Sequence, residues 1–158
     1  MPTTYTSPRA RWLRGAALGL VVLAACSRHV DGDHCDVPPH LVFQITDRAG
    51  ASLITSAVDV LTISYLEDGK LQTTSPYVPQ AANSSSTDYV FGDNLMPGKS
   101  LRGVTIYYLS FKGKTDTLEV KPQDECGYNP LTTFDGRAMP KLGPTAAIPT
   151  DYYQFRRR

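Results

Sequence analysis

Apolar and polar residues alternate along most of the chain after residue 40, which is the pattern of β-strands with one buried face. In the segment 41–46, for example, Leu41, Phe43 and Ile45 fall on one side at a period of two residues. The alternation predicts seven or eight short strands, and no stretch of the segment 40–158 shows a convincing helical period. The expected strands are 41–46, 58–66, 71–78, 88–92, 101–111, 115–120, 131–134 and 152–155.

Turn-forming residues predict how these strands pair. Asp68-Gly69 indicates a two-residue type I′ hairpin, because both central residues of that turn adopt positive φ. This register places Glu67 opposite Lys70, a favourable cross-strand charge pair. Pro76 has no backbone N–H, so the returning strand is expected at an edge of its sheet. Further turns are expected at 47–50, 79–87, 93–100 and 135–136.

A second hairpin is expected at Lys112-Gly113-Lys114. A three-residue loop there would pair Ile106 with Val120 and Tyr108 with Leu118, so that the apolar residues of both strands share one face. A two-residue loop would shift the register by one residue and mismatch those faces. The pattern therefore predicts the three-residue loop.

Many short strands with frequent turns favour an all-β fold. The specific expectation is an antiparallel β-sandwich of immunoglobulin-like or transthyretin-like kind, with a small closed barrel as the alternative. The proline-rich segment 136–150 is expected to be an irregular crossing that precedes the last strand.

The first 25 residues have the pattern of a secretory signal peptide. Three arginines and no acidic residue precede an apolar run over 16–25, which is too short to span a bilayer as a helix, since that requires about 20 residues. The run ends in Leu23-Ala24-Ala25-Cys26, which resembles the lipobox of bacterial lipoproteins. The resemblance implies cleavage between Ala25 and Cys26, a diacylglycerol thioether on Cys26, and an acyl group such as palmitate on the new amine.

The expected organisation is therefore a signal peptide over 1–25, a lipidated flexible tether over 26–39 and a β-sandwich domain over 40–158. Ser27 follows the anchor where a retention signal would place Asp, and by resemblance to other lipoproteins this favours the outer membrane. The lipid would make the membrane the first partner of the chain.

The cysteines support an extracytoplasmic location. With Cys26 assigned to lipid, Cys35 and Cys126 remain, and an oxidising compartment predicts a disulfide between them. Such a bond would close a loop of 91 residues and, in the chain-entropy model, stabilise the fold by about 4–5 kcal/mol. Two free thiols are the alternative.

Charge excludes one class of partner. The full chain has a net charge of +1, but the loss of residues 1–25 leaves 13 basic residues against 15 acidic ones. A basic face for nucleic acid is therefore not expected. Arg156, Arg157 and Arg158 are predicted to form a short solvated terminus.

Candidate catalytic and metal-ligating groups are few. His29, His34 and His40 lie near three aspartates, Asp31, Asp33 and Asp36, but in the expected tether, so neither a metal site nor a cofactor is predicted. No nucleophile motif is present, and no catalytic residue is assigned. A carboxylate pair is the remaining route to catalysis. The carboxylates available for it are Glu67, Asp68, Asp93, Glu119, Asp124 and Glu125.

Tyrosines are numerous after residue 64 and are expected mainly to pack within the sheets, although tyrosine also suits binding surfaces. Tyr107 and Tyr108 are adjacent and must point to opposite faces of a strand, so at most one of them is expected in the core.

The segment Tyr107–Tyr128, with Lys114-Thr115-Asp116-Thr117-Leu118 and Glu125-Cys126-Gly127-Tyr128, resembles small lipoproteins of Bacteroidota whose function is unknown. The resemblance implies a β-sandwich in the cell envelope and no functional residue. The expected function is a lipid-anchored, non-catalytic binding or structural module with an envelope protein as a candidate partner. A small envelope hydrolase or glycan-active enzyme that uses a carboxylate pair is the alternative.

Overall fold

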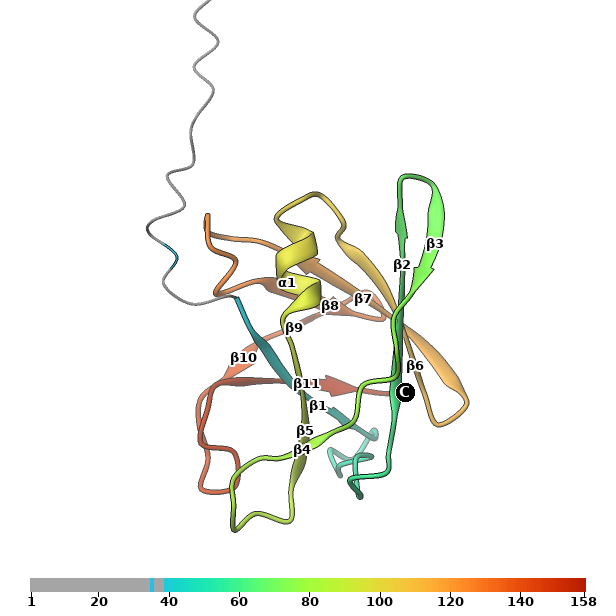
Figure 1. Cartoon of the computed structure of the whole chain (residues 1–158). Coiled ribbons are helices and arrows are strands. Elements are labelled where there is room, and N and C mark those ends of the chain that lie inside the picture. Colours follow the sequence, from blue (N-terminus) through green and yellow to red (C-terminus); the bar gives the residue numbers. More distant parts are fainter. Residues whose placement is uncertain (1–34, 36–38) are drawn as a thin grey trace, which may run out of the picture. The chain divides into compact units, whose positions relative to one another are not determined.

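The computed structural model describes Cys35 and residues 39–158, which form eleven strands and one short helix (Figure 1). The elements are β1 (Leu41–Thr46), β2 (Leu61–Glu67), β3 (Lys70–Thr73), β4 (Gln80–Ala81), β5 (Tyr89–Asp93), α1 (Leu95–Ser100), β6 (Ile106–Phe111), β7 (Lys114–Lys121), β8 (Leu131–Phe134), β9 (Arg137–Met139), β10 (Lys141–Leu142) and β11 (Tyr152–Arg156).

The strands form two sheets. The first has the order β10-β11-β1-β5-β4 and the second has the order β3-β2-β6-β7-β8-β9. Pairing is antiparallel throughout the described residues except between β1 and β11, which run parallel with Phe43 beside Tyr153 and Ile45 beside Phe155. The predicted all-β sandwich is confirmed, and the parallel pair is its one departure from an antiparallel arrangement.

The core lies between the inner faces of the two sheets. Alternate residues of the longer strands, such as β1, β2, β6 and β7, point inward, as the sequence pattern predicts. Aromatic rings bridge the sheets: the ring centroids of Phe134 and Phe155 are 5.1 Å apart, and those of Phe91 and Phe111 are 5.8 Å apart. Full burial of each such side chain contributes about 1.5–3 kcal/mol.

A smaller apolar cluster covers the other face of the first sheet. Val90 and Tyr152 pack there against Ile148, which comes from the irregular segment 143–150. The side-chain amide of Asn83 donates a hydrogen bond of 3.1 Å to the carbonyl of Ala147 and holds this segment in place. The irregular crossing predicted over 136–150 is confirmed only for 143–150, which covers the sheet, because residues 137–139 and 141–142 form β9 and β10.

Two predicted hairpins are confirmed, the first of them with its predicted register. Asp68 and Gly69 have φ of 51° and 73°, Glu67 pairs with Lys70, and β3 lies at the edge of its sheet. Asp135 and Gly136, with φ of 47° and 76°, join β8 to β9 in the same way.

The predicted loop between β6 and β7 is wrong. Lys112 and Gly113 alone form the turn, with φ of 48° and 72°, and Phe111 pairs with Lys114. Tyr107 therefore lies opposite Leu118, and both are fully buried. The three-residue loop followed from placing Ile106 and Tyr108 in the core, whereas the residues of β6 that point inward are Tyr107, Leu109 and Phe111.

Helix α1 occupies part of the segment that was expected to be only a turn, and β6 begins at Ile106 instead of residue 101. Asp93 Oδ1 accepts a hydrogen bond of 2.7 Å from the N–H of Met96 and so stabilises the first turn of the helix. Pro97 lies in that turn, where a missing N–H costs little. A helix of six residues is too short to show a period in the sequence.

Residues 58–60 also differ from the expected strand. The carboxylate of Asp59 accepts hydrogen bonds from the N–H groups of Thr55 and Ser56, at 2.8 and 3.2 Å, and closes a loop there. The strand β2 consequently begins at Leu61.

Candidate functional site

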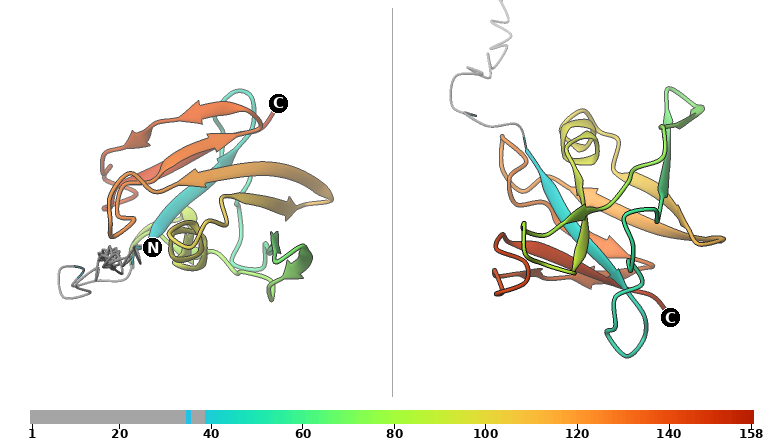
Figure 2. Two further views of the ribbon diagram at one scale, coloured as in Figure 1. Left: turned by 90° about the horizontal axis from the view of Figure 1, so that it is seen from above. Right: turned by 60° about the horizontal axis from the view of Figure 1, so that its bottom comes forward.

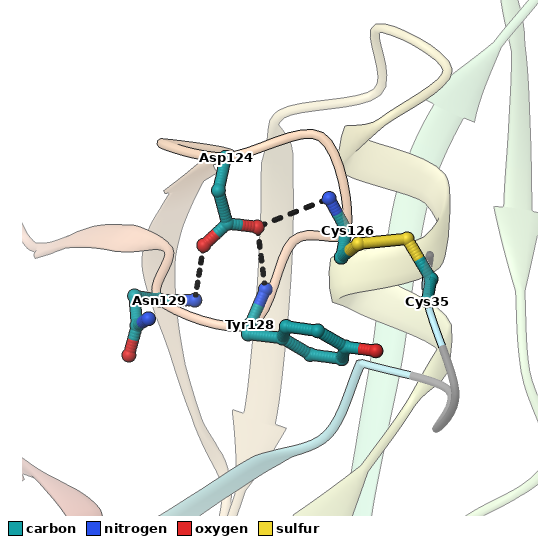
Figure 3. The surroundings of a disulfide bond; sticks show 5 residues. All are labelled: Cys35, Asp124, Cys126, Tyr128 and Asn129. Atoms are coloured by element: carbon teal, nitrogen blue, oxygen red, sulfur yellow. Dashed lines mark hydrogen bonds between the residues drawn. A yellow bond between two sulfur atoms is a disulfide. The ribbon is translucent and has the colours of Figure 1, made fainter. Parts of the chain in front are cut away.

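A disulfide joins Cys35 to Cys126, with their Cα atoms 5.5 Å apart (Figure 3). The predicted pairing is confirmed. Asp124 organises the loop around Cys126, because its carboxylate accepts hydrogen bonds of 3.1, 3.0 and 3.2 Å from the N–H groups of Cys126, Tyr128 and Asn129. Desolvation acts to raise the pKa of Asp124, but these N–H donors outweigh it and lower the pKa.

The predicted cleavage site at Ala25 and Cys26 lies outside the described residues, as does most of the tether. His29 and His34 lie there too, with the three neighbouring aspartates. Within residues 35 and 39–158, His40 is exposed and no group of three metal-ligating side chains occurs. No helix in that part of the chain has the length and apolar character needed to cross a membrane.

The carboxylates considered for catalysis occupy separate elements and make local contacts. Glu67 on β2 forms an ion pair with Lys99 of α1. Glu119 on β7 lies 2.6 Å from the ammonium of Lys121, and Asp124 holds the loop around Cys126. Asp68 lies exposed at a hairpin turn. Each of these four contacts or positions serves the local fold.

Asp93 is the most deeply buried of the candidate carboxylates, with 2% of its surface exposed. Burial raises its pKa, and the N–H of Met96 and the nearby Tyr77 hydroxyl oppose that effect. Burial, together with the negative charge of Asp93, raises the pKa of Tyr77 to about 12. The arrangement fixes the start of α1 against the first sheet.

The adjacent tyrosines on β6 separate as predicted. Tyr107 is fully buried, and its hydroxyl oxygen lies 2.9 Å from the carbonyl oxygen of Met96 and 2.6 Å from that of Val104, so its single proton is shared between these two acceptors. Tyr108 points to the outer face of the second sheet and is half-buried. Only Tyr107 therefore belongs to the core.

An apolar patch formed by Leu66, Leu71, Ile106 and Tyr108 lies on the outer face of the second sheet. Leu66 and Leu71 are cross-strand partners on β2 and β3, with 54% and 64% of their surfaces exposed. Leu66, Ile106 and Tyr108 also line a shallow hollow of about 260 Å³. This outer apolar patch adjoins the edge strand β3.

The prediction that the three C-terminal arginines form a solvated terminus is wrong for Arg157, whereas Arg156 and Arg158 are exposed. Arg157 is 6% exposed and makes an ion pair with Asp116, which is 8% exposed. Its Nε donates a hydrogen bond of 2.6 Å to Asp116 Oδ2, and its Nη1 donates one of 3.0 Å to the carbonyl of Phe111. These contacts tie the end of the first sheet to the β6–β7 hairpin of the second.

The sequence carried a signal for this buried pair. Tyr153, Phe155 and Arg157 fall on one face of β11 and its extension at a period of two, and Asp116 shares a face with Leu118 on β7. A basic and an acidic residue thus occupy inward positions on two different strands. A buried charge requires a partner of opposite sign, so the two positions fit each other.

Around Arg157 lies a hollow of about 340 Å³ that we call the basic groove, lined by Arg48, Arg137, Arg156, Arg157 and Arg158. Two further hollows share residues with it. One, of about 340 Å³, contains Met139, Pro140 and Leu142 beside Arg137 and Arg156. The other, of about 360 Å³, contains Lys112 and Lys114 beside three of the arginines.

No family model matches the chain, and no curated protein or solved structure matches it either.

Proposed function

We propose that the chain is a lipid-anchored protein of the bacterial cell envelope, located in the outer membrane, that acts as a non-catalytic binding or structural module. The observation that carries this proposal is the Cys35–Cys126 disulfide. Disulfides of this kind form in oxidising compartments, which supports export of the chain.

The disulfide also bears on the anchor. The sequence has three cysteines, and since Cys35 and Cys126 are joined to each other, neither is available to Cys26. Cys26 follows a signal-like segment and a pair of alanines, which supports its lipidation. Each buried methylene of an attached chain contributes about 0.8 kcal/mol, so two or three acyl chains hold a protein on the membrane almost permanently.

The same disulfide sets how far the domain can lie from the membrane. Cys35 lies nine positions after Cys26, and an extended chain of that length reaches about 30 Å at most. The domain would thus be held through Cys126 close to the bilayer surface.

The structural contacts of the candidate catalytic carboxylates favour binding over catalysis. Glu67, Glu119 and Asp124 have lysine or backbone N–H partners, and Asp93 holds the start of α1. In contrast, the described surface has an exposed apolar patch and a groove lined by arginines. Such surfaces are typical of recognition.

The test is expression of the full chain in a bacterium that matures lipoproteins, followed by membrane fractionation and intact mass measurement. We expect a mature chain that begins at Cys26 and carries the mass of a diacylglycerol group and an acyl chain. Cys26→Ala should abolish both the added mass and the membrane association. Cys126→Ser is the matched control, because it removes the disulfide and leaves the anchor.

A mature chain that begins elsewhere, or an unmodified Cys26 thiol, would overturn the proposal. Separation of inner and outer membranes on a density gradient tests the location, and recovery of the protein in the inner-membrane fraction would contradict that part.

A further inference from the structure

We infer that the basic groove binds a phosphate-bearing anion, with guanidinium groups of Arg48, Arg137 and Arg156 as its ligands. This assigns a ligand class to the binding module and so rests on the proposed function.

The fold gathers the groove from separate parts of the chain. Since β1 and β11 run parallel, their C-terminal ends lie side by side, and Thr46 is the partner of Arg156 (Figure 2). The turn after β1 carries Arg48, and the end of β11 carries Arg156 and Arg158. An antiparallel pair would have placed these arginines at opposite ends of the sheet.

Two more elements complete this end of the domain. β9 brings Arg137 to the wall of the groove, and the β6–β7 hairpin brings Lys112 and Lys114 to the adjoining hollow. Seven of the twelve basic residues in the segment 39–158 therefore lie at one end. The same segment contains twelve acidic residues, so the positive charge reflects an uneven distribution and not a basic composition.

Few of these cations are neutralised by carboxylates. Asp116 pairs with Arg157, and Asp59 lies 3.1 Å from the ammonium of Lys112. Asp47 lines the adjoining hollow and Asp135 precedes β9, but neither carboxylate lies within ion-pair distance of a cation, and they accept hydrogen bonds from the backbone N–H groups of Ala51 and Thr117.

In the part of the chain that the structure describes, the remaining five cations have no carboxylate partner within ion-pair distance. They are Arg48, Lys114, Arg137, Arg156 and Arg158. Unpaired like charges close together repel one another, and a bound anion relieves that repulsion.

Arg157 gives the groove a fixed floor. Its Nε and Nη1 donate to Asp116 and Phe111, and its Nη2 donates to Asp116 and to the carbonyl of Lys114. A guanidinium held in this way cannot swing out to bind a ligand. Its role is to position the end of β11, and with it Arg156 and Arg158, on the wall of the groove.

The residue types favour phosphate. A guanidinium presents two parallel N–H donors that match two oxygens of a phosphate, and such bonds are stronger than those between neutral groups. Arg156 already uses one Nη2 hydrogen bond, of 3.1 Å, to the side-chain oxygen of Gln154, which orients its guanidinium. Arginines, and no lysine, line the basic groove itself.

The hollow that adjoins the basic groove indicates that the ligand also has an apolar portion. Met139, Pro140 and Leu142 form an apolar shelf that begins at Arg137 and Arg156. A ligand whose phosphate lies on the arginines can rest a less polar portion on this shelf. A lipid head group and a soluble phosphate ester share this chemistry, so the experiment must separate them.

The test uses the full chain in a non-ionic detergent, titrated with inorganic pyrophosphate at constant ionic strength and followed by the NMR signals of arginine Nε–H groups. We expect the signals of Arg48, Arg137 and Arg156 to shift together in a saturable manner. Arg48→Ala with Arg137→Ala should weaken binding at least tenfold. Arg48→Lys with Arg137→Lys keeps the charge and should still weaken binding.

Lys70→Ala with Arg102→Ala is the matched control, because it removes the same charge from the other end of the second sheet. The β2–β6 pairing sets Leu61 beside Phe111 and Tyr65 beside Tyr107, so the turn before Lys70 and the β6–β7 turn lie at opposite ends. Binding by this control should stay within twofold of the unaltered chain. No saturable shift, shifts at other arginines only, or an equal loss in the control would each overturn the inference.

The source of the phosphate is decided with nanodiscs. Shifts of the same arginine signals in discs containing phosphatidylglycerol, but not in discs of phosphatidylcholine alone, would assign a lipid head group. Shifts with pyrophosphate only would assign a soluble phosphate. Mass measurement on the same sample separates the two proposals: a lipidated Cys26 without anion binding would remove the groove assignment and leave the anchor.

Discussion

At the scale of single residues, Arg157 and Asp116 form a buried ion pair between the two sheets. Both side chains are almost completely removed from solvent. Burying a charge costs several kcal/mol, and that cost is offset only when the partner and further hydrogen bonds are in place. Here the carbonyls of Phe111 and Lys114 supply the further bonds.

Asp116→Asn should therefore lower the free energy of unfolding by about 3–5 kcal/mol, because it leaves the Arg157 charge buried without its counterion. Chemical denaturation measures the loss. The control is Glu119→Ala on the same strand, which removes the more exposed pair with Lys121 and should cost no more than about 1 kcal/mol. Equal losses for the two variants would contradict a buried pair.

At this scale the sequence predicted the core and the disulfide well. Leu41, Phe43 and Ile45 fall on the buried face as their alternation indicates, and Cys35 pairs with Cys126. Arg157 was missed because three consecutive arginines are typical of a solvated segment. Its burial depends on Asp116, a residue 41 positions away on the other sheet. The local pattern of residues does not predict a contact between positions so far apart in the sequence.

At the scale of elements, the tight hairpins are defined by residues that adopt positive φ. Asp68-Gly69 and Asp135-Gly136 were correctly predicted because an acidic residue followed by glycine is the strongest short hairpin signal. Lys112-Gly113 adopts the same conformation without that signal. The sequence allowed a two-residue or a three-residue loop between β6 and β7. The three-residue loop was preferred because it places Ile106 in the core, but Ile106 is 39% exposed.

Gly113→Ala should lower the free energy of unfolding by about 1–2 kcal/mol, because φ of 72° is unfavourable for a residue with a Cβ. The Cβ itself would meet no atom within 4 Å, so the loss reports backbone strain alone.

The matched control is Gly98→Ala in α1, where a Cβ also meets open space and φ is not positive. Alanine there should raise the free energy of unfolding by up to about 1 kcal/mol, since alanine favours the helix over glycine. Changes of the same sign in both variants would contradict the two-residue turn.

At the scale of the whole molecule, the disulfide joins the segment before β1 to the loop between β7 and β8, residues that are 91 positions apart. It thereby connects the segment that leads into β1 of the first sheet with a loop of the second sheet. A bond that closes so long a loop restricts the unfolded chain strongly.

Replacing both Cys35 and Cys126 with serine should lower the free energy of unfolding by up to about 4–5 kcal/mol. Thermal melting in the absence of reductant measures the loss as a lower Tm. Addition of reductant should bring the unaltered chain to the Tm of the variant. If the two proteins melt together without reductant, the bond contributes nothing to stability.

The arrangement of strands was the part of the fold least accessible from sequence. Alternation predicts which residues of β1 and β11 face inward, but not that these two strands are neighbours or that they run parallel. The basic groove depends on that neighbourhood, because Arg48 and Arg156 are brought together by it. The sequence showed the arginines as isolated positions, and only the topology makes them a site.

The parallel neighbourhood of β1 and β11 also constrains the order in which the protein can assemble. β11 lies between β1 and β10, and its Phe155 stacks on Phe43 at 4.8 Å and on Phe134 at 5.1 Å. In a chain emerging from the ribosome, or from an export channel, Phe91 of β5 can reach Phe43 early, but the packing around Phe43 and Phe134 is incomplete until Phe155 has followed. One edge of β1 therefore stays unpaired until the last strand has been made, and a chaperone that shields apolar surface would act during that interval.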